Sequence, residues 1–218
     1  MSGDARNLNP ANLRGEAVDD EFMLNVVVGD SMLAAVIVGF TQMVLCFSYE
    51  DWESAKSNLE IIRTHRSEFD GHFGIGMILT FTAASYYELY YRVGNIKHKR
   101  AGRRVHRKVK KWATTGTEML VGPSVFLRAM EILCVERAPA DQVEIAFEEA
   151  ASACAAQRCR LLEALSVERL ARLFRSEGPN CECVTYVKRA VELYRSWGAV
   201  AKAEWLEKRY AHDLAKHL

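Results

Sequence analysis

Apolar residues recur at three- and four-residue spacing along most of this chain. In the segment that begins at Trp52, apolar side chains stand at positions 52, 55, 59 and 62, which lie on one face of a helix. The same period predicts further helices over residues of about 73–93, 97–114, 124–137, 142–153, 160–177, 181–196 and 199–214. Every apolar run long enough to interpret follows this helical period. The sequence therefore predicts an all-α fold.

Turn residues interrupt the helical pattern at intervals of about 40 to 45 residues. The junctions lie at residues 49–51, 94–95, 138–141 and 178–180. Each junction joins two helices into a hairpin, whose apolar face only the next hairpin can cover. The interval is longer than the roughly 34 residues of a regular tetratricopeptide array. We therefore expect an irregular stack of antiparallel helical hairpins, with one domain over residues 21–214 after a flexible N-terminal segment, residues 1–20.

A run of residues near the C-terminus carries a family resemblance. Residues 194–210 read aromatic-x-x-Trp-Gly-Ala-x-x-Lys-x-x-x-Leu-Glu-x-x-Tyr. Together with the acidic and aromatic turn at 50–55 and the basic helix that ends at 110–113, this pattern resembles a tetratricopeptide-like helical region. That region lies near the C-terminal half of large signalling proteins that combine a kinase-like domain, an AAA-type ATPase and often a histidine kinase. The resemblance covers residues 45–212 and implies a tetratricopeptide-like α-solenoid, a scaffold without catalytic residues.

One apolar segment bears on membrane association. Residues 32–47 are apolar except for Thr41 and Gln42, but sixteen residues fall short of the ~20 that span a bilayer. No cluster of Lys or Arg flanks the segment, so a buried core helix is favoured over a membrane span. The first twenty residues are polar and acidic, unlike a secretory signal peptide. We therefore expect a cytoplasmic protein whose six cysteines are reduced.

The residues that usually perform catalysis form no recognisable set in this sequence. The six histidines are scattered, and none stands in an H-E-x-x-H motif. The glycines at 71–76 lack both the order and the lysine of a phosphate-binding loop. Cys154 and Cys159, like Cys181 and Cys183, do not have the spacing of zinc ligands and are expected to fill helix interfaces. We therefore expect no enzyme activity, no cofactor and no metal site.

The strongest departure from an average surface is a basic segment. Residues 97–111 contain nine Lys or Arg and no acidic residue, so the rest of the chain carries a net charge of −8 against the overall +1. One interpretation is a binding site for an acidic partner or a polyanion. The other is a solvated outer helix that acidic neighbours such as Glu144, Glu148 and Glu149 offset. Because the resembling family often carries basic residues in this helix, we favour the solvated face.

The expected function is that of a non-catalytic scaffold for protein–protein interactions in a larger signalling or regulatory assembly. A peptide or helix of the partner would lie on the concave face of the stack, where the tyrosines 86, 87, 90 and 91 are expected to be exposed. The alternative is a binder of nucleic acid or anionic lipid through the basic helix. The candidate partner-binding residues are Lys97, Arg100, Arg103, Arg104, Arg107, Lys108, Lys111, Tyr86 and Tyr90.

Two details of packing follow from the helical period. In the basic helix, Ala101, Val105, Val109 and Trp112 share one inward stripe. At the C-terminus, Trp197, Leu206 and Tyr210 are expected to form the apolar seam by which the last helix closes the stack.

Overall fold

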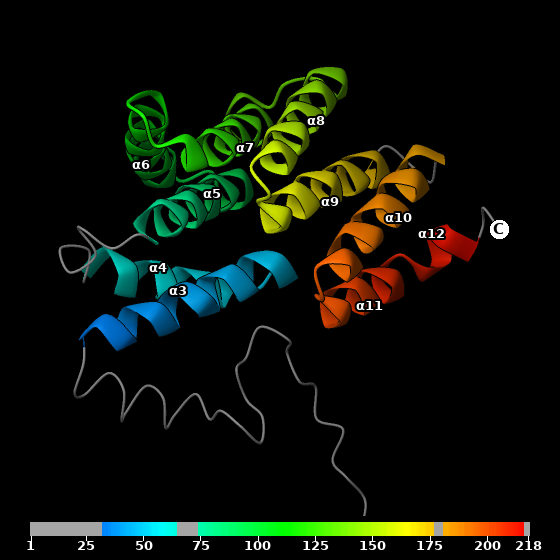
Figure 1. Cartoon of the computed structure of the whole chain (residues 1–218), viewed down its shortest axis with the longest axis horizontal. Coiled ribbons are helices and arrows are strands. Elements are labelled where there is room, and N and C mark those ends of the chain that lie inside the picture. The colour runs from blue at the N-terminus through cyan, green and yellow to red at the C-terminus, as the bar shows by residue number, and fades with distance from the viewer. Residues whose placement is uncertain (1–31, 65–73, 177–180, 216–218) are drawn as a thin grey trace, which may run out of the picture. The chain divides into compact units, whose positions relative to one another are not determined.

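The computed structural model describes residues 32–64, 74–176 and 181–215, which form a series of helices joined by short turns (Figure 1). Helices take up 89% of them, and none of them forms a strand. The predicted all-α class is therefore confirmed. The chain divides into two compact units, Met1–Ser85 and Tyr86–Leu218. Helix α5 (Ile75–Val93) crosses the boundary between the units, and the single domain over residues 21–214 stays a prediction.

The first unit contains α3 (Met32–Tyr49), α4 (Trp52–Thr64) and the first part of α5. Helices α3 and α4 pack against each other. Asp51 begins α4, because its carboxylate accepts hydrogen bonds from the backbone N–H and the hydroxyl of Ser54 at 3.1 and 2.8 Å. The ring of Phe47 meets the edges of Trp52 and Phe81, each at a centroid distance of 5.6 Å. These aromatic contacts form the centre of the unit's core.

The apolar segment that raised the question of a membrane span is helix α3. In the ranges that the structure describes, every helix is too short or too polar to cross a membrane.

The second unit continues from α5 through a series of helices that pack in chain order. They are α6 (Ile96–Thr114), the short 3-10 helix η3 (Glu118–Leu120), α7 (Val121–Glu131), the π-helical turn η4 (Ile132–Glu136), α8 (Ala140–Ala156), α9 (Arg160–Ser176), α10 (Cys181–Ser196), α11 (Val200–Arg209) and α12 (Ala211–Ala215). Helix α6 packs on α7, α7 on α8, α8 on α9, α9 on α10 and α10 on α11 (Figure 1). Each helix therefore covers an apolar face of the one before it.

Turn residues determine the end of α5 and the start of α6. Gly94 adopts a left-handed φ of 69° after α5, and the side chain of Asn95 then accepts a hydrogen bond from the Lys97 N–H to begin α6. Helix α8 begins at Ala140, after Pro139, so Asp141 lies in its first turn. The negative charge of the Asp141 carboxylate interacts favourably with the positive end of the helix dipole.

The C-terminal seam is partly as predicted. Leu206 and Tyr210 are buried in the core of α9, α10 and α11, which confirms their predicted positions. Trp197 is 43% exposed, so its predicted burial is wrong. The reason is that α10 ends at Ser196 and Trp197 stands in the turn before Gly198, outside the helical period that buries Tyr194.

A polar network that the sequence does not predict lies in the same core. Lys202 and Glu168 are both buried, and the Lys202 ammonium donates to Glu168 Oε1 at 2.8 Å. The Tyr194 hydroxyl donates to the other oxygen, Oε2, at 2.6 Å. Because each carboxylate oxygen has a donor, the network offsets the cost of removing these groups from water.

Candidate functional site

The inner face of α6 is held close to α5 by small and apolar residues. Val105 and Val109 are buried as predicted, whereas Ala101 and Trp112 are only half-buried. Gly102 is buried beside Tyr87, and a Cβ atom at this position would lie 2.8 Å from two carbon atoms of the Tyr87 ring. His106 is buried on the same side, which the sequence pattern did not indicate. Glycine at position 102 therefore sets the close approach of α6 to Tyr87.

The outer face of α6 carries a continuous row of exposed cations, which we call the basic stripe. Its members are Lys97, Arg100, Arg104, Arg107 and Lys111. At 100° per residue these positions fall within an arc of about 80° on the helix surface. The stripe from Arg100 to Lys111 is about 16 Å long at 1.5 Å per residue. All five side chains of the stripe are exposed.

Most cations of α6 form no ion pair with an acidic residue in the described part of the chain. Arg103 donates from Nε to Glu131 Oε1 at 2.6 Å. Lys108 is half-buried, with its ammonium 4.6 Å from the centre of the Trp112 ring. The cations of α6 that form no ion pair with a carboxylate of the described residues are Lys97, Lys99, Arg100, Arg104, Arg107, Lys110 and Lys111. The positive charge of the stripe is therefore uncompensated by neighbouring side chains in this part of the chain.

The acidic neighbours that were expected to offset this charge lie elsewhere. Glu144 accepts a hydrogen bond from the Tyr186 hydroxyl at 2.7 Å, and Glu148 pairs with Arg189 at 2.6 Å. Neither carboxylate forms an ion pair with α6. Glu149 does lie near α6, in the wall of the cavity described below. Two of the three carboxylates in the solvated-face interpretation therefore bond to side chains of α10 instead, and one of these side chains, Arg189, is a cation.

The tyrosines of α5 do not form an exposed aromatic surface. Tyr87 is 0% exposed, so its expected exposure is wrong, because α6 covers it at Gly102. Tyr86 is half-buried and stacks on the His98 ring at a centroid distance of 5.9 Å. Tyr90 is also half-buried, with the Lys99 ammonium 5.6 Å from its ring centre. Only Tyr91 is exposed as expected, and Arg137 lies over its ring.

A cavity of about 580 Å³ lies beside the basic stripe, among α6, α7 and α8. Its walls consist of Arg103, His106, Arg107, Lys110, Ser124, Val125, Arg128, Glu131 and Glu149. Four of these residues are cations that are always charged at neutral pH, and two are carboxylates. The lining therefore has a net charge of +2 when His106 is neutral.

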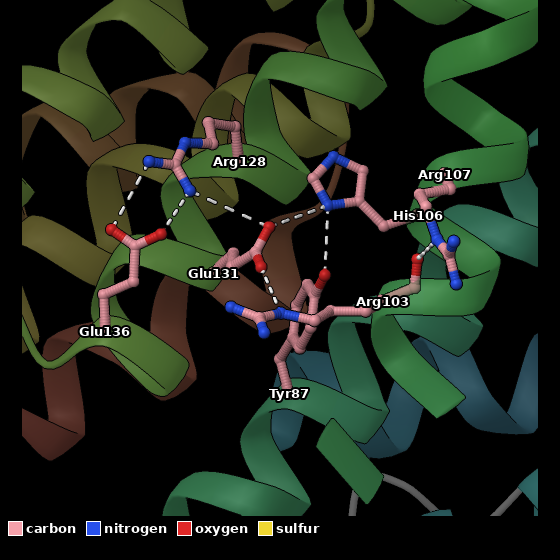
Figure 2. Close-up of polar contacts among 7 residues, drawn as sticks. All are labelled: Tyr87, Arg103, His106, Arg107, Arg128, Glu131 and Glu136. Carbon is pink, nitrogen blue, oxygen red and sulfur yellow. Dashed lines mark hydrogen bonds and ion pairs between the residues drawn. The ribbon is translucent and has the colours of Figure 1, made fainter. Parts of the chain in front are cut away.

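Glu131 organises the cationic side of this cavity (Figure 2). Beyond its bond to Arg103, its Oε2 atom lies 3.8 Å from a terminal nitrogen of Arg128 and 3.4 Å from His106 Nδ1. The Arg128 guanidinium also pairs with Glu136, which holds it from the far side. The Arg107 Nε lies 3.4 Å from the Arg103 carbonyl oxygen. Arg103 and Arg128 therefore have fixed orientations at the cavity. Arg107 and Lys110 form no ion pair with a carboxylate of the described residues.

His106 and Tyr87 form the buried floor behind these charges. The Tyr87 hydroxyl and His106 Nδ1 are 3.0 Å apart. Burial lowers the pKa of His106, an effect that Glu131 opposes and Lys110 reinforces, so the imidazole is neutral at pH 7. Burial also raises the pKa of the Tyr87 phenol well above its usual range, so the hydroxyl keeps its proton. The hydroxyl and Nδ1 share this hydrogen bond, and the tautomer of the neutral imidazole determines which of them donates.

The candidate residues named from the sequence separate into two groups. Arg103 and Arg107 reach the cavity, whereas Lys97, Arg100, Arg104 and Lys111 stay on the stripe outside it. The residues of the cavity that sequence reasoning missed are His106, Lys110, Ser124, Arg128 and Glu131. The one signal in the sequence was the three-residue spacing of Arg128 and Glu131, which places them on one helix face. That this face meets α6 follows only from the packing of α6 on α7.

Four cysteines of the described residues are buried, namely Cys46, Cys134, Cys154 and Cys183, and one of them lies close to the half-buried Cys159. Cys154 is buried at the end of α8, and its thiol hydrogen bonds to that of Cys159, which lowers the pKa of Cys159 to about 7. Cys183 donates to the carbonyl oxygen of Ala171 at 3.4 Å. Among the described residues, no three side chains of His, Cys, Asp or Glu lie close enough together to bind a metal ion.

Comparison of the chain with protein-family models, with curated proteins and with solved structures finds no match. The resemblance to the tetratricopeptide-like region therefore stays a prediction.

Proposed function

We propose that this chain is a non-catalytic interaction module whose basic stripe binds an acidic segment of a partner protein. The observation that carries the proposal is the row of cations on α6 without carboxylate partners among the described residues. Like charges at three- and four-residue spacing destabilise a helix by about 0.2–0.5 kcal/mol per pair. The carboxylates of a partner would replace this repulsion with attraction. A stack of tetratricopeptide-like hairpins, as the sequence suggests, is suited to presenting such a helix face.

The surroundings of the stripe favour a protein partner over nucleic acid. Proteins that bind single strands stack bases on exposed aromatic rings. The aromatic residues nearest to the stripe are already engaged: Trp112 by Lys108 and Tyr86 by His98. Exposed apolar side chains instead lie at the start of α6, where Val93 is 55% and Ile96 47% exposed. A basic row beside apolar contacts matches the mixed character of protein interfaces.

The length of the stripe defines a probe. A partner helix of about twelve residues spans the 16 Å between Arg100 and Lys111. We therefore choose a labelled synthetic helix of that length whose glutamates recur at three- and four-residue spacing, and measure its binding to the full chain by fluorescence anisotropy. The proposal predicts saturable binding at physiological ionic strength, with single-stranded DNA failing to compete.

A pair of matched double variants locates the interaction. Each exposed ion pair contributes about 0.2–1 kcal/mol, so R100Q/R104Q is expected to raise the Kd about 2- to 30-fold. The control K188Q/K208Q removes two exposed cations from α10 and α11 and is expected to leave the Kd unchanged. Equal effects of the two variants would mean that only net charge matters. Displacement of the peptide by DNA would favour the polyanion alternative.

A further inference from the structure

We propose that the cavity among α6, α7 and α8 binds a phosphomonoester, that is, a phosphate group attached to an organic molecule. The proposal concerns a ligand separate from the acidic segment at the basic stripe. It stands whether or not the stripe binds a protein. The argument rests on the charge of the cavity, the fixed positions of its arginines and its size.

The charge of the lining matches a dianion. Arg107 and Lys110 are one helical turn apart on α6, and both face the cavity without an ion pair to a described carboxylate. The negative charge of Glu131 is already shared by Arg103 and Arg128. Glu149 is the remaining carboxylate of the lining. Because Glu136 pairs with Arg128 from outside the wall, Arg107 and Lys110 are the two cations of the lining that form no ion pair with a described carboxylate. A phosphomonoester carries a charge of about −1.5 to −2 at pH 7 and offers charge to both cations, whereas a carboxylate offers charge to one.

The arginines of the cavity are positioned before any ligand arrives. Arg103 is held at Glu131, and Arg128 is held between Glu131 and Glu136 (Figure 2). Guanidinium groups donate two parallel hydrogen bonds to phosphate oxygens, and a fixed guanidinium loses less conformational entropy when it does so. Glu131 is therefore a positioning residue, which orients the arginines without contacting the ligand.

The size of the cavity indicates more than a bare phosphate ion. Sites for small organic ligands have volumes of about 300–1,000 Å³, a range that includes the 580 Å³ found here. Val125 contributes an apolar side chain and Ser124 a hydroxyl to the wall. The cavity therefore has room for an organic group beside the phosphate, together with apolar and polar atoms to contact it.

The test compares two ligands of the same shape and different charge. Phenyl phosphate is titrated into the full-length protein by isothermal titration calorimetry, and phenyl sulfate, a monoanion with the same tetrahedral head, is the control ligand. The proposal predicts that phenyl phosphate binds at least about tenfold more tightly than phenyl sulfate. Equal affinities, or no binding of phenyl phosphate in the millimolar range, would overturn the proposal.

Variants of α6 distinguish this site, which includes Arg107 of the stripe, from the part of the stripe that lies outside the cavity. R107Q/K110Q removes the two uncompensated cations of the cavity and is expected to weaken phenyl phosphate binding at least about tenfold. R100Q/R104Q removes two cations of the stripe and is expected to change it less than about twofold. The reverse order would place the anion on the stripe and refute the cavity site. Circular dichroism shows whether each variant keeps its helices. Failure of acidic-peptide binding with phenyl phosphate binding intact would refute only the function proposed for the stripe.

A second pair of probes identifies the source of the phosphate group. A free phosphorylated metabolite and a phosphorylated side chain of a protein present the same dianion. The affinity of O-phosphoserine is compared with that of a short peptide containing phosphoserine. Equal affinities support the cavity site with a small molecule as its ligand. Tighter binding of the peptide supports the same site with a phosphorylated segment as its ligand, whereas binding of neither contradicts it.

Discussion

At the scale of single residues, the least expected feature is the polar pair beneath the cavity. Tyr87 and His106 are both buried, and each would cost free energy there without a hydrogen-bonding partner. They partner each other across α5 and α6, and His106 also bonds to the backbone of Ser124. The neutral imidazole is therefore part of the packing of three helices.

The lowered pKa of His106 makes stability depend on pH. Below pH 6.5 the unfolded chain takes up a proton at this position, while the folded chain resists it. The contribution of His106 to stability is therefore present above its ordinary pKa of about 6.5 and declines as the pH falls through the folded-state value. We expect the urea midpoint to fall more between pH 7 and pH 5 in the parent than in His106→Gln. Both proteins share all other titrating groups, so equal declines would show that His106 does not resist protonation.

At the scale of elements, the approach of α6 to α5 depends on a single small residue. A Cβ atom at position 102 would lie 2.8 Å from the Tyr87 ring and 3.3 Å from the Tyr86 Cβ. Because Tyr87 is enclosed on all sides, its ring cannot move away cheaply. The gain of about 1 kcal/mol in helix propensity that alanine brings is therefore outweighed by strain.

We expect Gly102→Ala to lower the free energy of unfolding by about 1–3 kcal/mol. Gly39→Ala is the matched control, because it also lies inside a helix and its Cβ would meet Ile61 at an ordinary contact distance of 3.4 Å. That variant is expected to be neutral or more stable by up to about 1 kcal/mol. Chemical denaturation measures both values. A stable Gly102→Ala protein would mean that α6 does not lie this close to Tyr87.

The helices themselves could be predicted from the sequence, because each buries one periodic face. The C-terminal end of α5 and the start of α6 could be predicted from Gly94 and Asn95, whose conformations are determined locally. The burial of Trp197 was predicted wrongly because it depends on where α10 ends. The spacing of apolar residues does not determine the last residue of a helix. The contact of Gly102 with Tyr87 depends on which helix covers which, and local patterns do not contain that information.

At the scale of the whole molecule, the distribution of charge decides the functional argument. The sequence alone shows the concentration of positive charge in residues 97–111. It does not show where the compensating carboxylates lie. In the described part of the chain, Glu144 and Glu148 pair with Tyr186 and Arg189 and leave α6 cationic.

The residues of the cavity could likewise be predicted only in part from the sequence. Arg103 and Arg107 could be chosen from the basic segment, whereas Arg128 and Glu131 could not, because they come from α7 and reach the cavity only when α7 packs on α6. Charge composition predicts that a helix is basic. The tertiary structure determines which of its cations remain available to a ligand.

The most direct test of the central claim, that α6 is the binding surface, is a nuclear magnetic resonance titration of the ¹⁵N-labelled full chain with the acidic peptide. We expect the largest amide shifts in residues 97–111 and a weaker effect at higher salt, because exposed charges are screened. The variant R100Q/R104Q should reduce these shifts, and K188Q/K208Q should not. Saturable binding whose shifts lie outside α6, or that both variants leave intact, would contradict the account.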